Sequence, residues 1–273
     1  MYKYLILIFL FYKNILFCQK DTLSWQLKTD IPCSELRDMS TDAIGNIYVL
    51  TDGYSINKYN ITGSKLTSFT QNRMGNATAV DAGNALKVMV WYDQFRELLL
   101  LDRNLTQSGG LLNLNTLGMS EAHIVRPAAD GHFWTYEEVA GRLYKISFRG
   151  EVLLESQQMT QWLDQRLNIQ HIADDGAQVI AADTSVGFLI FNTFGQYQQT
   201  IRAAMATPYF AIAGQWLNWI TPDGAMQQMN LNIPADQRSS LLPVAWNHIK
   251  QIRLYPGSIL IWDGATIKAY QYD

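Results

Sequence analysis

The chain has 273 residues, of which 48% are hydrophobic and 16% are charged, and its formal net charge is −3. A chain of this length buries a substantial core, and this composition excludes an intrinsically disordered protein. The slightly acidic balance also argues against a nucleic-acid-binding protein, which normally carries a basic face.

The N-terminal residues 1–18 are predicted to be a secretory signal peptide. Lys3 supplies a positive start, and an apolar run follows at residues 4–12. A membrane-spanning helix needs about 20 apolar residues, so this run has the proportions of a signal peptide instead. Cleavage after Cys18 would leave residues 19–273 as a single mature domain; the alternative is a lipid anchor on Cys18. We therefore expect an exported protein, either periplasmic or associated with the outer membrane.

The remainder of the chain contains an internal repeat. A glycine-containing turn followed by an apolar strand recurs about every 42 residues, which is the length of one four-stranded propeller blade. Each repeat is also typical of a meander of short strands joined by tight turns, as at residues 47–51, 55–60 and 65–70 of the first. The repeated turns contain Gly45, Gly83, Gly131, Gly176, Gly214 and Gly257.

The two ends of the repeat array complement each other. The segment 24–30 precedes the first repeat, and the sixth repeat stops after its third strand, at residues 266–273. The N-terminal strand is therefore predicted to complete the last blade and close the ring. The expected fold is an all-β, six-bladed β-propeller of four-stranded blades. The helical pattern is confined to residues 156–167, where Met159, Trp162, Leu163 and Leu167 share one face.

The second repeat contains the best candidate for an interaction site. Its strands, within residues 86–106, are far more apolar than those of the other repeats, and the turn between them displays Phe95 and Arg96. Aromatic residues and arginine are the types that anchor protein interfaces. We therefore predict that Asp93, Phe95 and Arg96 contact a partner; the alternative is that Phe95 folds back onto an adjacent blade.

The sequence contains no recognisable catalytic apparatus. No two of the four histidines are spaced i, i+4, and there is no P-loop, no dinucleotide-binding motif and no G-x-S-x-G elbow. We predict no catalytic residue, no metal site and no cofactor. His132 and His171 are expected to be structural or solvent-exposed, and the aspartates near the glycine turns are expected to serve the turn backbone instead of a central calcium ion. These aspartates are Asp42, Asp81, Asp130, Asp174 and Asp175.

Two functional alternatives remain open at this point. One is a metal-dependent, lactonase-like hydrolase, for which Glu35, Asn76 and Asn247 are candidate oxygen ligands at the mouth of the channel. The other is a glycan or small-ligand binder that uses exposed aromatic residues at a channel mouth. An open polar channel would favour the latter, and a channel filled with apolar side chains would count against it.

The sequence resembles known propellers. Residues 41–63, TDAIGNIYVLTDGYSINKYNITG, resemble blades of the NHL-like six-bladed superfamily. Residues 81–105, with 131–136 and 187–197, are similar to a family of small exported propellers of Bacteroidota. This resemblance implies an envelope protein without established catalysis, such as an accessory of the type IX secretion machinery. The sequence thus favours a non-catalytic protein-binding or scaffold propeller with a protein partner in the envelope. It would bind no nucleic acid and would meet the membrane only through its partner or a lipid on Cys18.

Overall fold

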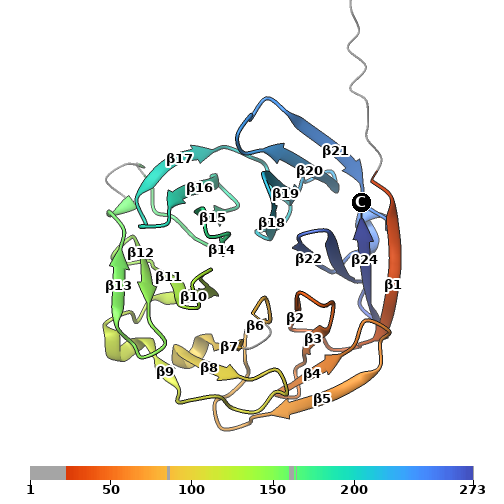
Figure 1. The fold of residues 1–273 in the computed structure, drawn as a ribbon, viewed down its shortest axis with the longest axis horizontal. Helices are drawn as coiled ribbons and strands as arrows, with labels where there is room; N and C mark the ends of the chain where they lie inside the picture. Colours follow the sequence, from red (N-terminus) through yellow and green to blue (C-terminus); the bar gives the residue numbers. More distant parts are fainter. Residues whose placement is uncertain (1–22, 85–86, 160–162, 164, 273) are drawn as a thin grey trace, which may run out of the picture.

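The structure, a computed structural model, describes residues 23–84, 87–159, 163 and 165–272. Six four-stranded sheets surround a central axis, and within each sheet all the strand pairs are antiparallel (Figure 1). The prediction of a six-bladed β-propeller is confirmed. The predicted signal peptide, residues 1–18, lies outside the described residues.

Each blade is a simple meander whose first strand lies nearest the axis. Blade 1 comprises β2 (Asp38–Thr41), β3 (Ile47–Leu50), β4 (Ser55–Tyr59) and β5 (Lys65–Thr70). Blade 2 comprises β6 (Ala79–Asp81), β7 (Val88–Tyr92), β8 (Glu97–Leu101) and β9 (Leu112–Asn113). Blade 3 comprises β10 (Ala122–Pro127), β11 (Phe133–Glu137), β12 (Arg142–Ile146) and β13 (Val152–Glu155). Blade 4 comprises β14 (His171–Asp174), β15 (Gln178–Asp183), β16 (Gly187–Asn192) and β17 (Tyr197–Ile201). Blade 5 comprises β18 (Phe210–Ala213), β19 (Trp216–Ile220), β20 (Ala225–Asn230) and β21 (Gln237–Leu241). Blade 6 comprises β22 (Gln251–Tyr255), β23 (Ser258–Trp262), β24 (Thr266–Tyr272) and β1 (Trp25–Pro32).

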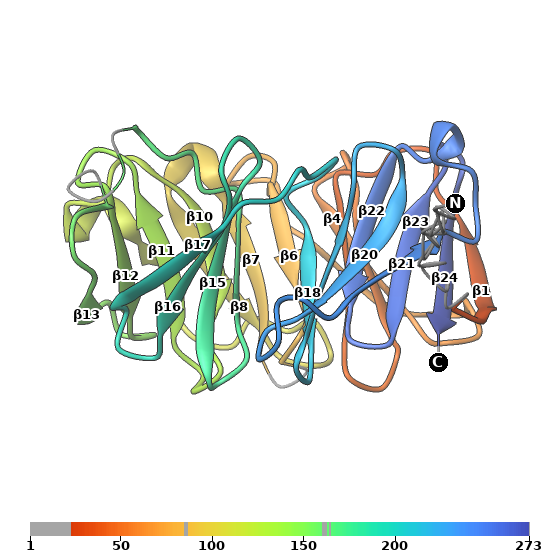
Figure 2. The same cartoon turned by 90° about the horizontal axis from the view of Figure 1, so that it is seen from above.

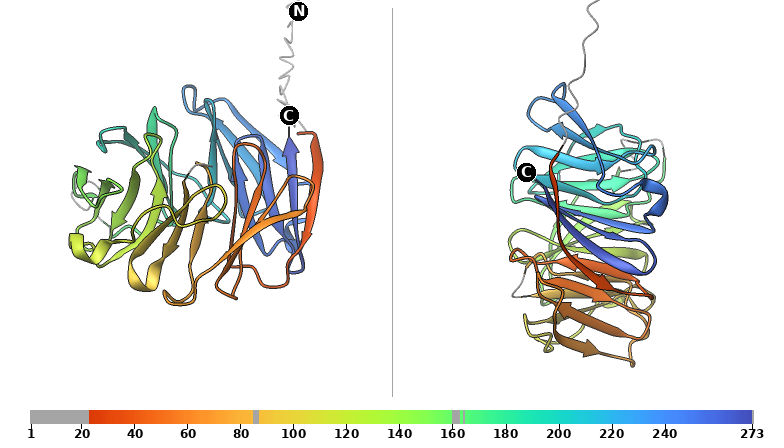
Figure 3. Two further views of the ribbon diagram at one scale, coloured as in Figure 1. Left: turned by 60° about the horizontal axis from the view of Figure 1, so that its bottom comes forward. Right: turned by 90° about the vertical axis from the view of Figure 1, so that its right-hand side faces the viewer.

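The ring is closed by the N-terminal strand, as predicted. In blade 6, β1 pairs with β24 in antiparallel register, with Trp25 opposite Tyr272 and Pro32 opposite Thr266 (Figure 3). Ile31 of β1 is buried in the same apolar cluster as Ile47 of blade 1. The N-terminal segment therefore contributes both backbone hydrogen bonds to the last blade and apolar contact to the first.

The core lies between the blades. The second strand of a blade packs against neighbouring blades on both of its faces, so its side chains are mostly apolar, without interruption in VMVWY of β7. The fourth strand lies at the rim and is largely exposed, as β5 shows. This gradient explains why the sequence signal is strongest in the strand that follows each glycine turn.

The propeller has two faces, which Figure 2 shows edge-on. The upper face carries the loops that lead into each innermost strand and the turns between second and third strands. The lower face carries the turns between first and second strands and between third and fourth strands. All six predicted glycine turns lie between first and second strands, on the lower face.

Helical structure is limited to short turns in the part of the chain that the structure describes. These are the 3₁₀ turns η1 (Asp93–Phe95), η2 (Leu114–Leu117) and η4 (Trp246–His248). No described helix has the length and apolar character needed to cross a bilayer. In the predicted helical segment, the Leu163 N–H donates to the Met159 carbonyl at 3.0 Å, and Met159 is buried. Trp162 of that segment lies outside the described residues.

Candidate functional site

The innermost strands enclose a central channel. Its cavity has a volume of about 580 Å³, which lies in the range of small-molecule sites. The wall is not filled by apolar side chains. Each of the six blades contributes a polar or charged side chain to it, and we call this set the channel ring: Asp38, Asp81, Arg126, His171, Tyr209 and Arg253.

On one side of the ring, Arg253 is held by Asp38. Its Nη2 and Nε donate to Asp38 Oδ1 at 2.5 and 3.0 Å, and both side chains are buried. Asp38 also accepts hydrogen bonds from the backbone N–H groups of Met39 and Val80, at 2.9 and 3.0 Å. The Arg253 guanidinium lies 3.4 Å from the centroid of the Tyr209 ring. This pair therefore links blades 6, 1 and 2 around the point where the ring closes.

On the other side of the ring, Arg126 has different surroundings. Its Nε donates to His171 Nδ1 at 3.3 Å, and its Nη1 donates to the Val125 carbonyl at 3.1 Å. Arg126 is only 8% exposed. Within the described ranges, no carboxylate lies at ion-pair distance from its guanidinium, whereas Arg253 has one.

Charge and burial set the protonation of the ring. Burial, together with the nearby Arg126 and Arg253 cations, holds the pKa of His171 well below its usual value. His171 is therefore neutral; because its Nδ1 accepts from Arg126, its proton is on Nε2. Burial raises the pKa of Asp81, an effect that the charge of Arg126 opposes. The ring thus combines two cations with one firmly paired carboxylate and a second whose charge is disfavoured.

The channel continues toward the upper face. A second cavity, of about 280 Å³, shares Asp38, Arg126 and Tyr209 with the first. Its outer wall includes Asp93 and His123, which belong to blades 2 and 3. One of the predicted interaction residues therefore stands at the upper mouth of the channel.

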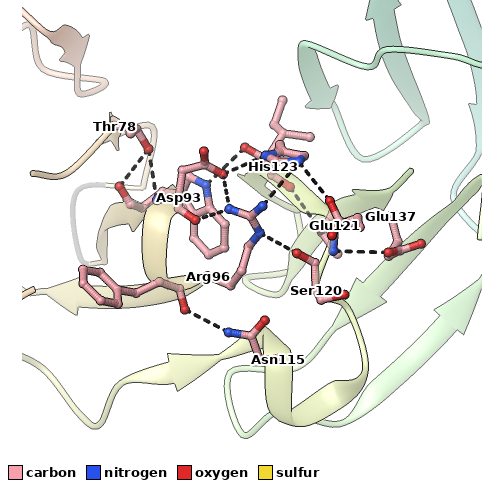
Figure 4. A network of polar contacts seen from close by, with 12 residues as sticks. Thr78, Asp93, Arg96, Asn115, Ser120, Glu121, His123 and Glu137 are labelled. Carbon is pink, nitrogen blue, oxygen red and sulfur yellow. Dashed lines mark hydrogen bonds and ion pairs between the residues drawn. The ribbon is translucent and has the colours of Figure 1, made fainter. Parts of the chain in front are cut away.

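The predicted interaction residues Asp93 and Arg96 form part of a polar network (Figure 4). Arg96 Nη1 pairs with Asp93 Oδ1 at 2.8 Å, and its Nε donates to the Ser120 carbonyl at 2.8 Å. His123 lies 3.2 Å from Asp93 Oδ1 and 3.3 Å from Arg96 Nη2. The guanidinium of Arg96 therefore joins the turn of blade 2 to the first strand of blade 3. A role of these residues in partner binding stays a prediction.

The third predicted interaction residue, Phe95, is directed away from this network. Its side chain is among the exposed large apolar groups, and its ring lies beside Gly75 in the loop between blades 1 and 2. Phe95 thus leans on the adjacent loop while leaving much of its surface in solvent.

The residues considered for a metal site lie in three separate loops on the upper face. Glu35 and Asn247 are exposed, in the loops before β2 and β22, while Asn76 is half-buried in the loop before β6. Among the described residues, no three His, Cys, Asp or Glu side chains are grouped as a metal site would require.

The aspartates near the glycine turns serve the turn backbone, as predicted. Asp42 Oδ1 accepts from the N–H groups of Ile44 and Asn46, and Asp174 Oδ1 accepts from that of Gly176 at 2.8 Å. His171, expected to be structural or solvent-exposed, lies in the wall of the channel beside Arg126. No motif around His171 distinguishes it, because its position depends on blades that are distant in the sequence.

The lower face exposes large apolar side chains, which the sequence reasoning did not identify. They lie in its turns, and we call them the apolar rim: Ile44, Ile61, Phe148, Phe194 and Ile233. Four of them lie in equivalent turns, between the third and fourth strands of blades 1, 3, 4 and 5.

The turns that carry the rim share one local structure. A polar side chain at the start of the turn accepts backbone N–H groups further along it, as Asn60 does from Thr62 and Ser64. Asn192 does the same for Phe194 and Gln196. Such a cap fixes the turn through its own side chain and leaves the residues at the tip facing solvent.

Comparisons with known proteins support the fold alone. No protein-family model matches the chain, and no curated protein matches it. Among solved structures, it is similar to virginiamycin B lyase from Staphylococcus aureus, with a TM-score of 0.59 and 9% identity over 91% of this chain and 99% of that chain. A streptogramin B lyase structure gives a TM-score of 0.60 and 10% identity over 92% and 98% of the two chains. The β-propeller domain of Cps50 (Swd1) from Myceliophteria thermophila gives 0.59 and 10% identity over 86% and 82%.

Proposed function

We propose that this protein is a non-catalytic, protein-binding propeller of the cell envelope, and that it docks its partner through the apolar rim of the lower face. The observation that carries this proposal is the repeated exposure of a large apolar side chain at equivalent turns of several blades. Exposed apolar groups that gather on one face of a soluble protein mark interaction surfaces.

Folding does not require apolar side chains at these positions. The turns are fixed by their polar caps and by glycine, and the side chains of Phe194 and Ile233 at the tips make little contact with the core. Phe194 is 68% exposed and Ile233 is 58% exposed. A polar residue there would leave the fold intact and would lower the exposed apolar area, so the apolar choice is better explained by a partner.

The rim also has the arrangement of an extended contact. Phe148, Phe194 and Ile233 come from the consecutive blades 3, 4 and 5, and Lys87 lies 5.6 Å from the centroid of the Phe148 ring. On blade 1, the Ile61 side chain lies against the backbone of Gly45, next to Ile44. A partner with an apolar surface and acidic groups at its edge fits these features.

The N-terminal sequence and the resemblance to exported propellers support the proposed setting in the cell envelope. The predicted signal peptide, residues 1–18, supports export of a single domain, residues 19–273. The resemblance to small Bacteroidota propellers favours an envelope complex, such as the type IX secretion machinery, as the assembly to which the protein is accessory.

The test is affinity purification of the tagged protein from its native envelope in gentle detergent, read by mass spectrometry. The wild-type protein is expected to recover a stoichiometric protein partner, and the double variant Phe194→Ser, Ile233→Ser is expected to lose it. The matched control is Leu66→Ser, Leu241→Ser on the outer strands, where the exposed fractions are 54% and 63%. Recovery of a monomer alone, or equal recovery by all three proteins, would overturn the proposal.

A second contact on the upper face remains part of the proposal. Phe95 is exposed beside the network of Asp93 and Arg96, and these residues were the candidates from the sequence. Purification of Phe95→Ala, Arg96→Ala in parallel separates the two faces. Loss of the partner in this variant with retention in the rim variant would place the docking surface on the upper face.

A further inference from the structure

The channel contains two buried arginines whose environments differ. Arg253 has a carboxylate partner, Asp38, at 2.5 Å. Arg126 lies across the same cavity and donates to one neutral imidazole and one backbone carbonyl. The two side chains are similarly buried, at 8% and 7% residue exposure, so burial does not explain the difference.

A buried guanidinium without an anion is unfavourable. Removing a cation from water costs free energy that only a partner of opposite charge or a complete set of acceptors offsets. In the described part of the chain, Nη2 of Arg126 has no hydrogen-bond acceptor, and the nearby Asp81 is not at ion-pair distance. Arg126 lines both the central cavity and the upper one, so this unused donor is accessible from the channel.

We propose that the channel binds a small molecule bearing a single carboxylate, with the carboxylate held by Arg126 and by the Nε2–H of His171. Nε of Arg126 is used by His171, but Nη2 and the second N–H of Nη1 form a parallel pair that can bind the two oxygens of a carboxylate, and the imidazole adds a third donor. This site is separate from the apolar rim, and it does not depend on the docking proposal.

The charges of the ring favour one negative charge on the ligand. Arg126 is the cation without a carboxylate partner, whereas Arg253 is matched by Asp38. A dianion such as phosphate would also face Asp38 and Asp81 across the cavity, and like charges at short range disfavour it. The raised pKa of Asp81 is consistent with a wall that accepts one additional anion if Asp81 is neutral.

The shape of the cavity limits the rest of the ligand. Three consecutive blades each contribute an alanine to the wall: Ala128, Ala173 and Ala211. Blade 6, across the ring from Arg126 of blade 3, contributes the large side chains of Tyr255 and Arg253. A volume of about 580 Å³ is large enough for a ligand of monosaccharide size.

The experiment is a titration of the 15N-arginine-labelled, full mature protein, followed through the Nε–H signals of its arginines by NMR. The probe is acetate, which contains the carboxylate alone; acetamide is the neutral probe of the same shape, and inorganic phosphate is the dianionic one. We expect a saturable shift of the Arg126 signal with acetate, with a Kd on the order of 1–10 mM for so small a probe. Acetamide should produce no saturable shift.

Variants test whether the acetate-dependent NMR shift arises from binding to Arg126. Arg126→Met should abolish the saturable effect of acetate on the other channel arginine, Arg253, and Arg126→Lys should weaken binding about tenfold because its ammonium lacks the bidentate fork. Arg149→Met, which changes an exposed arginine of blade 3, should leave binding unchanged. If Arg126→Met does not fold, the wild-type comparison of acetate with acetamide, together with Arg126→Lys, still decides the question.

Three results would overturn the proposal. The first is the absence of any saturable shift with acetate, and the second is acetate binding that is as strong in Arg126→Met and Arg126→Lys as in the wild-type protein. The third is saturable binding of phosphate without binding of acetate, which would replace the carboxylate by a phosphoryl group. Because the measurement uses the isolated protein and a channel signal, it does not depend on whether a docking partner is found.

Discussion

Replacing Arg253 by methionine tests how the ring is closed. The variant Arg253→Met keeps a long apolar side chain but removes the cation that accompanies the buried carboxylate of Asp38. Asp38 would retain only the backbone donors Met39 and Val80. Because the carboxylate remains buried without a counter-charge, we expect a large loss of stability.

The magnitude follows from the burial of the pair. The two side chains are 8% and 4% exposed, so solvent screens their interaction poorly. Removing one partner of such a pair typically costs about 3–5 kcal/mol. For a chain of this size, that corresponds to a decrease in Tm of about 6–20 °C.

The assay is thermal and urea unfolding, followed by tryptophan fluorescence. The matched control is Lys268→Met in the same blade, where Lys268 pairs with Asp263 at 2.9 Å but both groups are partly exposed. Solvent screening limits the contribution of that pair to the free energy of unfolding to about 1 kcal/mol or less. The double variant Asp38→Asn, Arg253→Met removes both charges and should be more stable than Arg253→Met alone, because no unpaired ion remains.

The reasoning would be refuted by either of two results. One is a cost for Arg253→Met no greater than that for Lys268→Met. The other is a double variant whose loss of stability equals the sum of the losses measured for Asp38→Asn alone and Arg253→Met alone. A coupled pair must be strongly non-additive.

Two further predictions concern the backbone and the channel. Gly187 has φ +121°, and a Cβ there would collide with the backbone of residues 201–203, so Gly187→Ala should cost roughly 2–4 kcal/mol; Gly214→Ala, at φ +60° with open space, should cost about 1 kcal/mol in the same unfolding assay. The folded-state pKa of His171 lies below its unfolded value of about 6.5, so the unfolded state binds the proton first, and stability should be lost as the pH falls below that value. The decrease in Tm from about pH 7.5 to about pH 5.5 should therefore be smaller in His171→Gln than in the wild-type protein. An equal decrease in the two proteins would contradict a lowered pKa of His171.

The fold was predictable because its signals are local and periodic. Each blade repeats the same glycine turn and the same apolar second strand, and both features are set by residues adjacent in the sequence. The closure by β1 was predictable for the same reason, since the sixth repeat lacks a fourth strand and the segment before the first repeat lacks a blade. The aspartates of the turns also followed from local backbone chemistry.

The candidate sites depend on contacts that no local pattern encodes. Arg126 and His171 are separated by 45 residues, yet they meet because the same strand of consecutive blades lines the axis. The apolar rim was missed for a different reason: a single phenylalanine or isoleucine in a turn is unremarkable until several blades place one on the same face. Conversely, Arg96 was singled out by residue type, and the structure uses its guanidinium to bind Ser120 and His123 of the neighbouring blade.

The geometry of a propeller separates the two proposed sites from the elements that stabilise it. Stability resides between the blades and in the pair of Asp38 with Arg253, and neither the rim nor Arg126 contributes a carboxylate contact to it. A side chain that the fold does not need can vary without unfolding the protein. Five turns have large apolar tips, and a buried arginine lacks an ion partner among the described residues. These two observations are therefore more informative about binding than any feature of the core.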